Sequence, residues 1–189
     1  MLKDLVYRCR SYRRFYEDAR ISKQELWELA DLARMTASTA NSQALKYRLV
    51  EQEEECRKVF DTLGWAAALP DWAGPEEGER PSAYIVVLCD QTLGKNKQID
   101  VGIVSQTMML GAAEKGYGGC MLATVKRPEL AEVLGLDLER FTVELVLALG
   151  KPKEEVRVVP VGPDGSVKYY RDENQVHYVP KRSLEDIFV

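Results

Sequence analysis

The sequence predicts an α+β fold in which helices and buried strands surround one sheet, and three observations support this prediction. Residues 83–89 form a continuous apolar run of strand length, typical of a strand that is buried on both faces, and residues 142–150 form a second strong strand. Apolar residues recur at helical spacing after Ser22, and residues 99–115 form a second run of helical length. The length of 189 residues fits one domain at ~100–200 residues per domain, so we expect residues 1–189 to form a single domain.

Composition excludes several classes of protein. The chain has 26 Lys and Arg against 30 Asp and Glu, and this net charge of −4 argues against a general nucleic-acid binder. Neither a membrane span nor a signal peptide is predicted, so we expect a cytoplasmic protein. The single histidine, His177, excludes a multi-histidine metal site, and we expect no metal. The cysteines form no C-x-x-C pair and are expected to be reduced core thiols: Cys9, Cys56, Cys89 and Cys120.

The first half of the chain contains one well-marked helix start. Ser22 and Glu25 form a capping box, so a helix is expected from Ser22. Residues 47–50 are expected to form a short strand. A helix should follow through Cys56, Val59, Phe60 and Leu63, with Gly64 as its stop. Residues 65–82 contain three prolines and two tryptophans, a composition that predicts an irregular segment, and loops of this length are usually functional lids or mobile segments.

The second half begins with the apolar strand over residues 83–89. The helix over residues 99–115 is apolar nearly all round, which predicts a place at the centre of the fold or in an interface. Gly116, Gly118 and Gly119 are expected to end it, before a short strand over residues 120–123. Pro128 and Gly135 bracket a small helix, and residues 142–150 form the last strong strand.

The C-terminal part has a different pattern. Residues 162–165 (Gly-Pro-Asp-Gly) predict a turn between two short alternating runs, so a hairpin is expected within residues 156–178. Residues 176–189 contain too few apolar residues to form a core of their own. We therefore expect a C-terminal arm that packs on something else.

The N-terminal segment carries the densest functional pattern. Its first fifteen residues hold five basic side chains and one acid, so this segment has a charge of +4 within a chain of −4. Arg10 and Arg13 flank Ser11, and guanidinium groups with a hydroxyl suit a phosphate. The alternative interpretation is a solvated basic face near a helix end.

Other candidate residues are spread along the chain. Small polar residues at 38–43 would let the backbone approach a ligand, and the amides of Asn41 and Gln43 could read the edge of a heterocycle. The alternative is a plain polar turn. The glycines at 116–119 either expose amide groups to a flat anionic ring or form a tight turn. Further candidates are the basic pair Lys181 and Arg182, His177, and two rings that could cover a planar substrate, Trp65 and Trp72.

Five short motifs follow one another in a fixed order: Arg10-Ser11-x-Arg13, Ser38-x-x-Asn41-x-Gln43, Asp100-x-Gly102-Ile103-x-x-Gln106, Gly116-x-Gly118 and Leu147-x-Leu149-Gly150-x-Pro152. In this order they resemble the FMN-dependent nitroreductase family. The resemblance runs from about residue 5 to residue 152, and residues 179–184 resemble the closing segment of the family.

This resemblance implies a homodimeric flavoprotein with a central, mostly antiparallel sheet flanked by helices and an exchanged C-terminal arm. FMN would be bound non-covalently at the dimer interface. It would take hydride from NADH or NADPH and reduce small nitroaromatic, quinone or enone molecules by a ping-pong route. In such proteins the flavin carries the redox step, so no side chain need act as an acid or base.

The resemblance also implies roles for particular residues. Arg10, Ser11 and Arg13 would hold the phosphate and ribityl groups, with Lys181 or Arg182 assisting. The remaining cofactor contacts would come from Ser38, Asn41, Gln43, Gly118 and Gly119, with Trp65 and Trp72 as a substrate lid. Ala37, Ala44 and Leu45 depart from the family pattern, in which prolines and a tryptophan are common. A flavin-binding protein without turnover and an anionic-nucleotide module without flavin are the alternatives.

Overall fold

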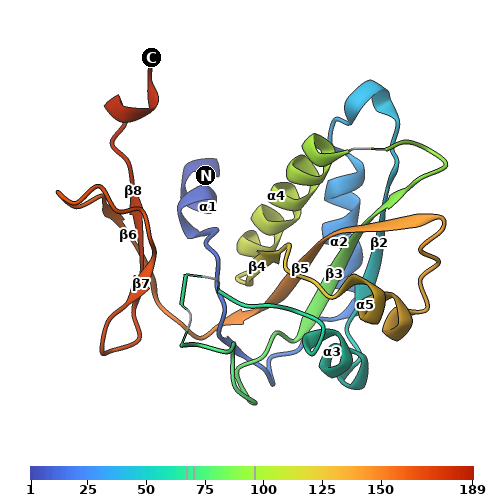
Figure 1. The fold of residues 1–189 in the computed structure, drawn as a ribbon, viewed down its shortest axis with the longest axis horizontal. Helices are drawn as coiled ribbons and strands as arrows, with labels where there is room; N and C mark the ends of the chain where they lie inside the picture. The colour runs from blue at the N-terminus through green and yellow to red at the C-terminus, as the bar shows by residue number, and fades with distance from the viewer. Residues whose placement is uncertain (67, 70, 96) are drawn as a thin grey trace.

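The computed structural model describes residues 1–66, 68–69, 71–95 and 97–189. Its main sheet contains five strands, and a second sheet of three strands lies near the C-terminus (Figure 1). In chain order the elements are α1 (Leu2–Arg8), β1 (Phe15–Tyr16), α2 (Lys23–Arg34), the 3-10 helix Thr39–Asn41, β2 (Leu45–Val50), α3 (Glu53–Phe60), β3 (Ala83–Asp90), α4 (Gln98–Glu114), β4 (Gly118–Leu122), α5 (Arg127–Leu134), β5 (Phe141–Pro152), β6 (Val156–Pro160), β7 (Tyr170–Arg171), β8 (His177–Lys181) and the 3-10 helix Glu185–Ile187.

The main sheet is antiparallel throughout and is built around β3. Strand β3 pairs with β2 on one side and with β5 on the other, and the long β5 also pairs with β1 and β4. Every residue of β3 is buried. Alternate residues of a strand point to opposite faces, so Ile85 and Val87 pack with α2 and α4, whereas Tyr84 and Val86 pack with α3 and α5. Helices therefore cover both faces of the sheet.

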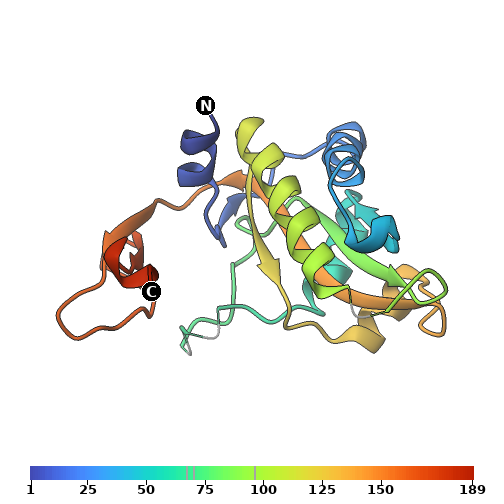
Figure 2. The same ribbon diagram turned by 90° about the horizontal axis from the view of Figure 1, so that it is seen from above.

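Helix α4 occupies the middle of one layer, with α1 on one flank and α2 on the other (Figures 1 and 2). Its inner residues are buried, but Ile99 is 75% exposed and Ile103 is 38% exposed. The expected apolar helix is therefore confirmed, and it keeps a narrow apolar strip on its outer face.

Most of the predicted elements are confirmed. The Ser22 hydroxyl accepts a hydrogen bond from the Glu25 amide at 3.3 Å, and the Glu25 carboxylate accepts one from the Ser22 amide at 2.9 Å. Gly135 ends α5 in the left-handed conformation at φ 63°. The described residues of the 65–82 segment form neither helix nor strand, as predicted, although Pro70 lies outside the described residues.

Two local predictions are wrong, and one helix was not predicted. Helix α3 ends at Phe60 and not at Gly64. A Cβ atom at Gly64 would lie 2.5 Å from Thr124 Cγ2, so a glycine is needed there because Thr124 packs closely against it. Gly118 and Gly119 lie inside β4, and only Gly116 among the three adopts a positive φ. Helix α1 was not predicted because no recognised cap residue precedes it.

The expected hairpin around residues 162–165 is also wrong. Those residues do form a turn, with the Gly165 amide donating to the Gly162 carbonyl at 3.0 Å. The strand before the turn, β6, pairs in parallel with β8 and not with the run that follows. The true hairpin joins β7 to β8 and turns through Gln175 at φ 62°. The small sheet thus has the order β6-β8-β7, and a single domain over residues 1–189 stays a prediction.

Candidate functional site

The N-terminal segment after α1 runs along the edge of β4. Ser11 forms a parallel bridge with Gly119, and the Tyr12 amide donates to the Gly119 carbonyl at 2.9 Å. These contacts bring Arg10, Ser11 and Arg13 to the end of the sheet where β4 begins. Two of the predicted motifs, far apart in sequence, therefore lie side by side.

The two glycines of β4 make this approach possible. A Cβ atom at Gly118 would meet the Tyr12 ring, and its next neighbour would be Pro152 Cγ at 2.7 Å. A Cβ atom at Gly119 would meet the backbone oxygen of Ala148. Glycine is thus required here by close packing. Whether these two residues also contact a ligand stays a prediction.

A pocket of about 220 Å³ opens where β4 ends. Arg13, Trp65 and Tyr169 contribute side chains to it, and the remaining lining residues are Gly64, Ala66 and the run from Cys120 to Thr124. Two buried nitrogen atoms have no hydrogen-bond partner, Arg13 Nε and Trp65 Nε1. Buried donors without a partner cost free energy, so a ligand rich in hydrogen-bond acceptors would suit this pocket.

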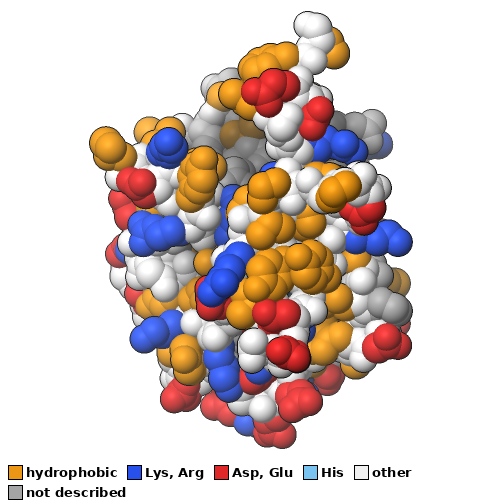
Figure 3. Space-filling view, turned by 90° about the vertical axis from the view of Figure 1, so that its left-hand side faces the viewer, with side chains coloured by type: hydrophobic (Ala, Val, Ile, Leu, Met, Phe, Trp, Pro, Cys, Tyr) orange, Lys and Arg blue, Asp and Glu red, His pale blue; other side chains and the backbone are white. Residues whose placement is uncertain are grey.

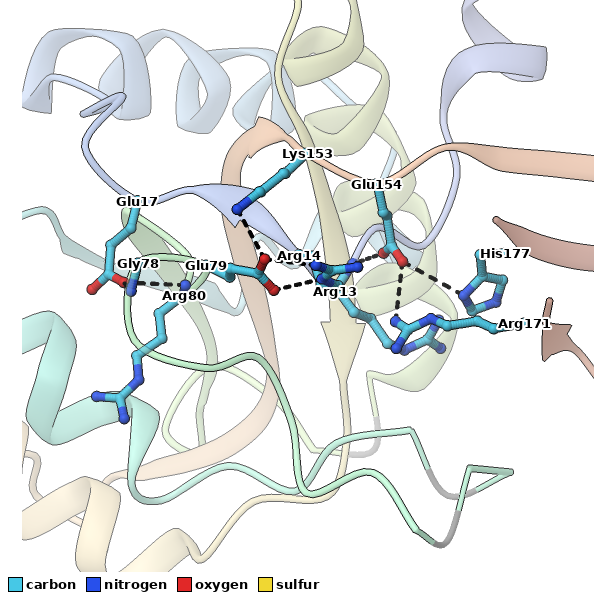
Figure 4. A network of polar contacts seen from close by, with 10 residues as sticks. All are labelled: Arg13, Arg14, Glu17, Gly78, Glu79, Arg80, Lys153, Glu154, Arg171 and His177. Atoms are coloured by element: carbon cyan, nitrogen blue, oxygen red, sulfur yellow. Dashed lines mark hydrogen bonds and ion pairs between the residues drawn. The ribbon is translucent and has the colours of Figure 1, made fainter. Parts of the chain in front are cut away.

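Arg13 is held in a buried cluster of charged groups (Figure 4). Its backbone amide donates to Glu154, whose carboxylate also pairs with Arg171 at 3.0 Å and lies 3.8 Å from His177 Nδ1. Burial alone would raise the pKa of Glu154. The contacts from His177 and the Arg13 amide and the charge of Arg171 outweigh it, so the pKa of Glu154 lies below its usual value. The Glu154 carboxylate therefore stays ionised and holds the Arg13 amide and the Arg171 guanidinium.

Arg14 belongs to a separate ion-pair group. Its Nε and Nη2 atoms donate to the two oxygens of Glu79 at 2.5 and 2.6 Å, and Lys153 Nζ lies 2.9 Å from the same carboxylate. The Arg14 hydrogen bonds lower the pKa of Glu79 to about 2, against the opposite effect of partial burial. This group fastens the 74–82 segment to β1 and leaves Arg14 engaged within the protein (Figure 4).

The polar loop at residues 38–43 lies at the start of α4. The buried Asp100 carboxylate accepts hydrogen bonds from the Thr39 amide at 2.9 Å and from its hydroxyl at 2.7 Å. Ala40, Asn41 and Gln43 all have positive φ, between 48° and 52°. Such left-handed residues cost on the order of 1–3 kcal/mol each and tend to gather at functional sites. The loop is therefore held in an unusual shape by its neighbours.

The two groups of predicted residues do not meet within one chain. Ser38, Asn41 and Gln43 lie beside the start of α4, on its α2 flank, whereas the Arg10–Arg13 segment lies near its end, on its α1 flank (Figures 1 and 2). Helix α4 has 17 residues, which corresponds to about 25 Å at ~1.5 Å per residue. The two groups therefore lie on opposite flanks and at different levels of α4, which argues against their meeting on one small ligand within the same chain.

The C-terminal candidates form a third location. Lys181 and Arg182 line a groove of about 610 Å³ between the tail and the 158–165 segment. Trp72 lies under the Arg171 guanidinium at 4.2 Å and does not line the pocket to which Trp65 belongs. His177 is fully buried and stacks on Tyr169 at 5.2 Å, so it packs inside the protein.

Other features carry less chemistry. A larger cavity of about 830 Å³ lies between α2, α3 and the open edge of β2, but none of the predicted site residues lines it.

All four cysteines are free, and burial raises the pKa of each thiol, which keeps it protonated. Within the described ranges, no group of three or more metal-binding side chains gathers, and no helix is long and apolar enough to cross a bilayer.

The protein has an α+β fold of the nitroreductase type. Helices cover both faces of its antiparallel sheet, and a basic segment packs against β4, which begins with two glycines. The sequence model of the nitroreductase family matches residues 6–151, and the chain belongs to this family. YdgI of Bacillus subtilis strain 168, provisionally assigned as an NAD(P)H nitroreductase, is 25% identical over 179 aligned positions, which cover 77% of this chain and 86% of YdgI.

Solved structures agree with this assignment of the fold. A provisionally assigned nitroreductase from Desulfovibrio desulfuricans, solved in complex with FMN, has a TM-score of 0.72 at 18% identity, covering 100% of this chain and 95% of that one. A provisionally assigned NAD(P)H:FMN oxidoreductase from Staphylococcus epidermidis has a TM-score of 0.71 at 16% identity with the same coverage. CLA-ER, an enone reductase of gut-bacterial fatty acid saturation, has a TM-score of 0.67 at 18% identity, covering 82% of this chain and 90% of that one.

Sequence reasoning missed three residues of the site. Tyr12 anchors the basic segment to β4, Glu154 holds Arg13 and the small sheet, and Tyr169 lines the pocket. Glu154 could have been noticed as an acid directly after the last strong strand. No spacing or motif distinguishes Tyr169 from its neighbour Tyr170.

Proposed function

We propose that this member of the nitroreductase family is an FMN-dependent oxidoreductase that uses NADH or NADPH to reduce small nitroaromatic, quinone or enone acceptors. The observation that carries the proposal is the junction of the Arg10–Arg13 segment with β4, beside a pocket with unpaired buried donors. A phosphate is bound well by guanidinium donors, which Arg10 and Arg13 supply. A flat ring with acceptor atoms suits a narrow pocket with free donors, which lies beside them.

The residues present fit FMN. Arg10 is half-buried and its Nε has no partner, while Ser11 is exposed next to it, so both can face the phosphate and ribityl groups. Arg13 lines the pocket and can face the ribityl group or the ring. At about 220 Å³ the pocket is smaller than the ~300–1,000 Å³ that a drug-sized ligand occupies, so part of FMN would lie outside it.

We propose that a second copy of the chain completes the site. A two-fold axis across the outer face of α4 would run two α4 helices antiparallel and place the start of one beside the end of the other. The Asn41 and Gln43 amides of one copy would then face the Arg10–Arg13 segment of its partner. The exposed Ile99 and Ile103 supply an apolar strip for this contact.

The C-terminal arm also fits a dimer. Residues 181–189 are all exposed, including Leu184, Ile187 and Phe188, so the tail has little support on its own chain. Figure 3 shows hydrophobic side chains gathered on the face that carries the small sheet. We propose that this arm reaches the partner copy and that Lys181 or Arg182 assists in binding phosphate there.

In this proposal the bound flavin supplies hydride transfer, and the residues of the chain bind it, orient it and exclude water. No side chain is assigned as an acid or base. At Gly118 and Gly119 the backbone would come close to the flavin ring. Trp65 would cover a planar acceptor, and Trp72 would support the 65–82 segment that carries both tryptophans. We further propose that residues 1–189 act as one domain in the cytoplasm, where free thiols are stable.

The test is an anaerobic titration of the purified protein, first reconstituted with FMN. Loss of the oxidised flavin absorbance on addition of NADH or NADPH, and its return on addition of a nitroaromatic or a quinone, is the expected result. Bound FMN that stays oxidised with both donors would favour a flavin-binding protein without turnover. Protein that cannot be reconstituted with FMN would overturn the proposal.

A further inference from the structure

The segment that leads into the small C-terminal sheet contributes a wall to the pocket at the end of β4. Among the lining residues that the structure describes, Tyr169 is the one that comes from beyond β5. Trp65 stands on the same pocket from a different segment, and Met121 and Leu122 come from β4. The pocket is therefore closed by a part of the chain that lies outside the main sheet.

Tyr169 is held in place by three contacts. The Arg13 guanidinium lies 4.7 Å from the centre of its ring, and the His177 ring stacks on it at 5.2 Å and 28°. Its hydroxyl accepts a hydrogen bond from the Ala68 amide at 3.3 Å. These contacts come from the N-terminal segment, from β8 and from the 65–72 region, so the ring has a defined position.

The segment that carries Tyr169 is itself anchored in the protein. Arg171 pairs with the fully buried Glu154 side chain at 3.0 Å and lies over the Trp72 ring at 4.2 Å. The adjacent ring of Tyr170 stacks on Tyr178 and is 49% exposed, so it takes no part in the pocket. Two neighbouring tyrosines therefore have different surroundings, one in the pocket and one at the surface.

We propose that Tyr169 is a specificity-determining residue that makes this site select flat aromatic acceptors over non-planar aliphatic ones. The inference rests on the proposed function, because it takes this pocket as the place where ring and acceptor meet. Aromatic side chains favour edge-on as well as offset packing against another flat ring, and Tyr169, whose faces are covered by Arg13 and His177, offers its edge. With Trp65 and Tyr169 on one small pocket, a planar acceptor contacts aromatic surface that a puckered aliphatic enone cannot match.

The test compares two acceptors in variants of the FMN-loaded protein. Nitrobenzene represents the flat class and 2-cyclohexenone the aliphatic class, and the measured quantity is the ratio of their kcat/KM values with NADH or NADPH. Tyr169→Leu keeps much of the volume without the ring, Tyr169→Phe keeps the ring without the hydroxyl, and Tyr170→Ala is the matched control. Tyr169→Leu should lower the ratio about 2- to 10-fold, the range of one aromatic pair, whereas the other two should keep it.

A second measurement does not depend on turnover. Benzoate, a flat ring that is not reduced, is titrated into the protein with and without FMN while tryptophan fluorescence is recorded. Tyr169→Leu should weaken benzoate binding by a similar factor, and Tyr170→Ala should not. An unchanged ratio and unchanged benzoate affinity in Tyr169→Leu would overturn the inference. Failure to bind FMN, or to be reduced by either nicotinamide, would instead overturn the proposed function.

Discussion

The Tyr12 amide donates a hydrogen bond to the Gly119 carbonyl at 2.9 Å, which fixes the basic N-terminal segment against the first residues of β4. At the other end of α4, Asp100 holds Thr39 and with it the strained polar loop. Each of these two contacts organises one half of the predicted FMN site. Their separation along α4 is the reason to propose that two chains build each site.

Arg10→Ala and Arg13→Ala should each weaken FMN binding. Each substitution removes charge-assisted hydrogen bonds of roughly 1.5–3 kcal/mol, which corresponds to about 10- to 100-fold in the dissociation constant. Quenching of FMN fluorescence on binding measures the change. Arg8→Ala, an exposed arginine at the end of α1, is the control and should bind FMN as the wild type does. Unchanged affinity in both test variants would remove the phosphate assignment.

If the proposed dimer forms, Ile103→Lys should convert it into monomers. Ile103 lies on the outer strip of α4, and a lysine there would place two ammonium groups near the proposed two-fold axis, where burial of an unpaired charge is costly. Sedimentation velocity measures the mass of the particle. Leu138→Lys, at an exposed leucine between α5 and β5, should leave it unchanged. A wild-type protein that sediments as a monomer contradicts the proposal directly.

Gly119→Ala should destabilise the fold. The new methyl group would meet the Ala148 backbone oxygen, which cannot move without breaking the pairing of β4 with β5, so we expect a loss of about 1–3 kcal/mol in the free energy of unfolding. Urea unfolding provides the measurement. Gly94→Ala is the matched control, since its methyl group would meet the far end of the Lys97 side chain, which can rotate away. Equal stability of the two variants would show that β4 is not packed as described.

The Arg14–Glu79 pair should make stability depend on acid pH. The pKa of Glu79 is lowered from 4.5 to about 2, so its contribution is complete above pH 4.5 and is lost as the pH falls toward 2. Glu79→Gln should be less stable at neutral pH and should lose less stability across that interval. Urea unfolding at several pH values measures both effects. Glu77→Gln, at an exposed neighbour, should follow the wild type, and a Glu79→Gln slope equal to the wild-type slope would contradict the assignment.

The main sheet and its helices could be predicted because their signals are local. The Ser22 capping box and the apolar run at residues 83–89 each specify their own structure within a few residues. The small sheet could not be predicted in the same way. Strands β6 and β8 pair directly and in parallel, although β7 lies between them in the sequence. A turn such as Gly162–Gly165 indicates a change of direction but does not identify the partner strand.

Some residues of the candidate site could likewise be predicted from a local signal, and others could not. Arg10, Ser11 and Arg13 stand out because the first fifteen residues carry a net charge of +4 in an acidic chain. Glu154 and Tyr169 do not stand out, because their importance comes from long-range contacts with Arg13 that no spacing records. The separation of Asn41 from Arg13 within one chain is likewise a property of the fold, set by the length of α4.

The central claim, that each FMN site is shared between two chains, is tested most directly by mixing two inactive variants. Arg10→Ala/Arg13→Ala damages one half-site and Asn41→Ala/Gln43→Ala damages the other. After the two are unfolded together and refolded, random pairing would give mixed dimers in which one site has both halves intact, so about one site in four should bind FMN with wild-type affinity. A mixture that binds no more FMN than the two variants do separately would contradict the claim.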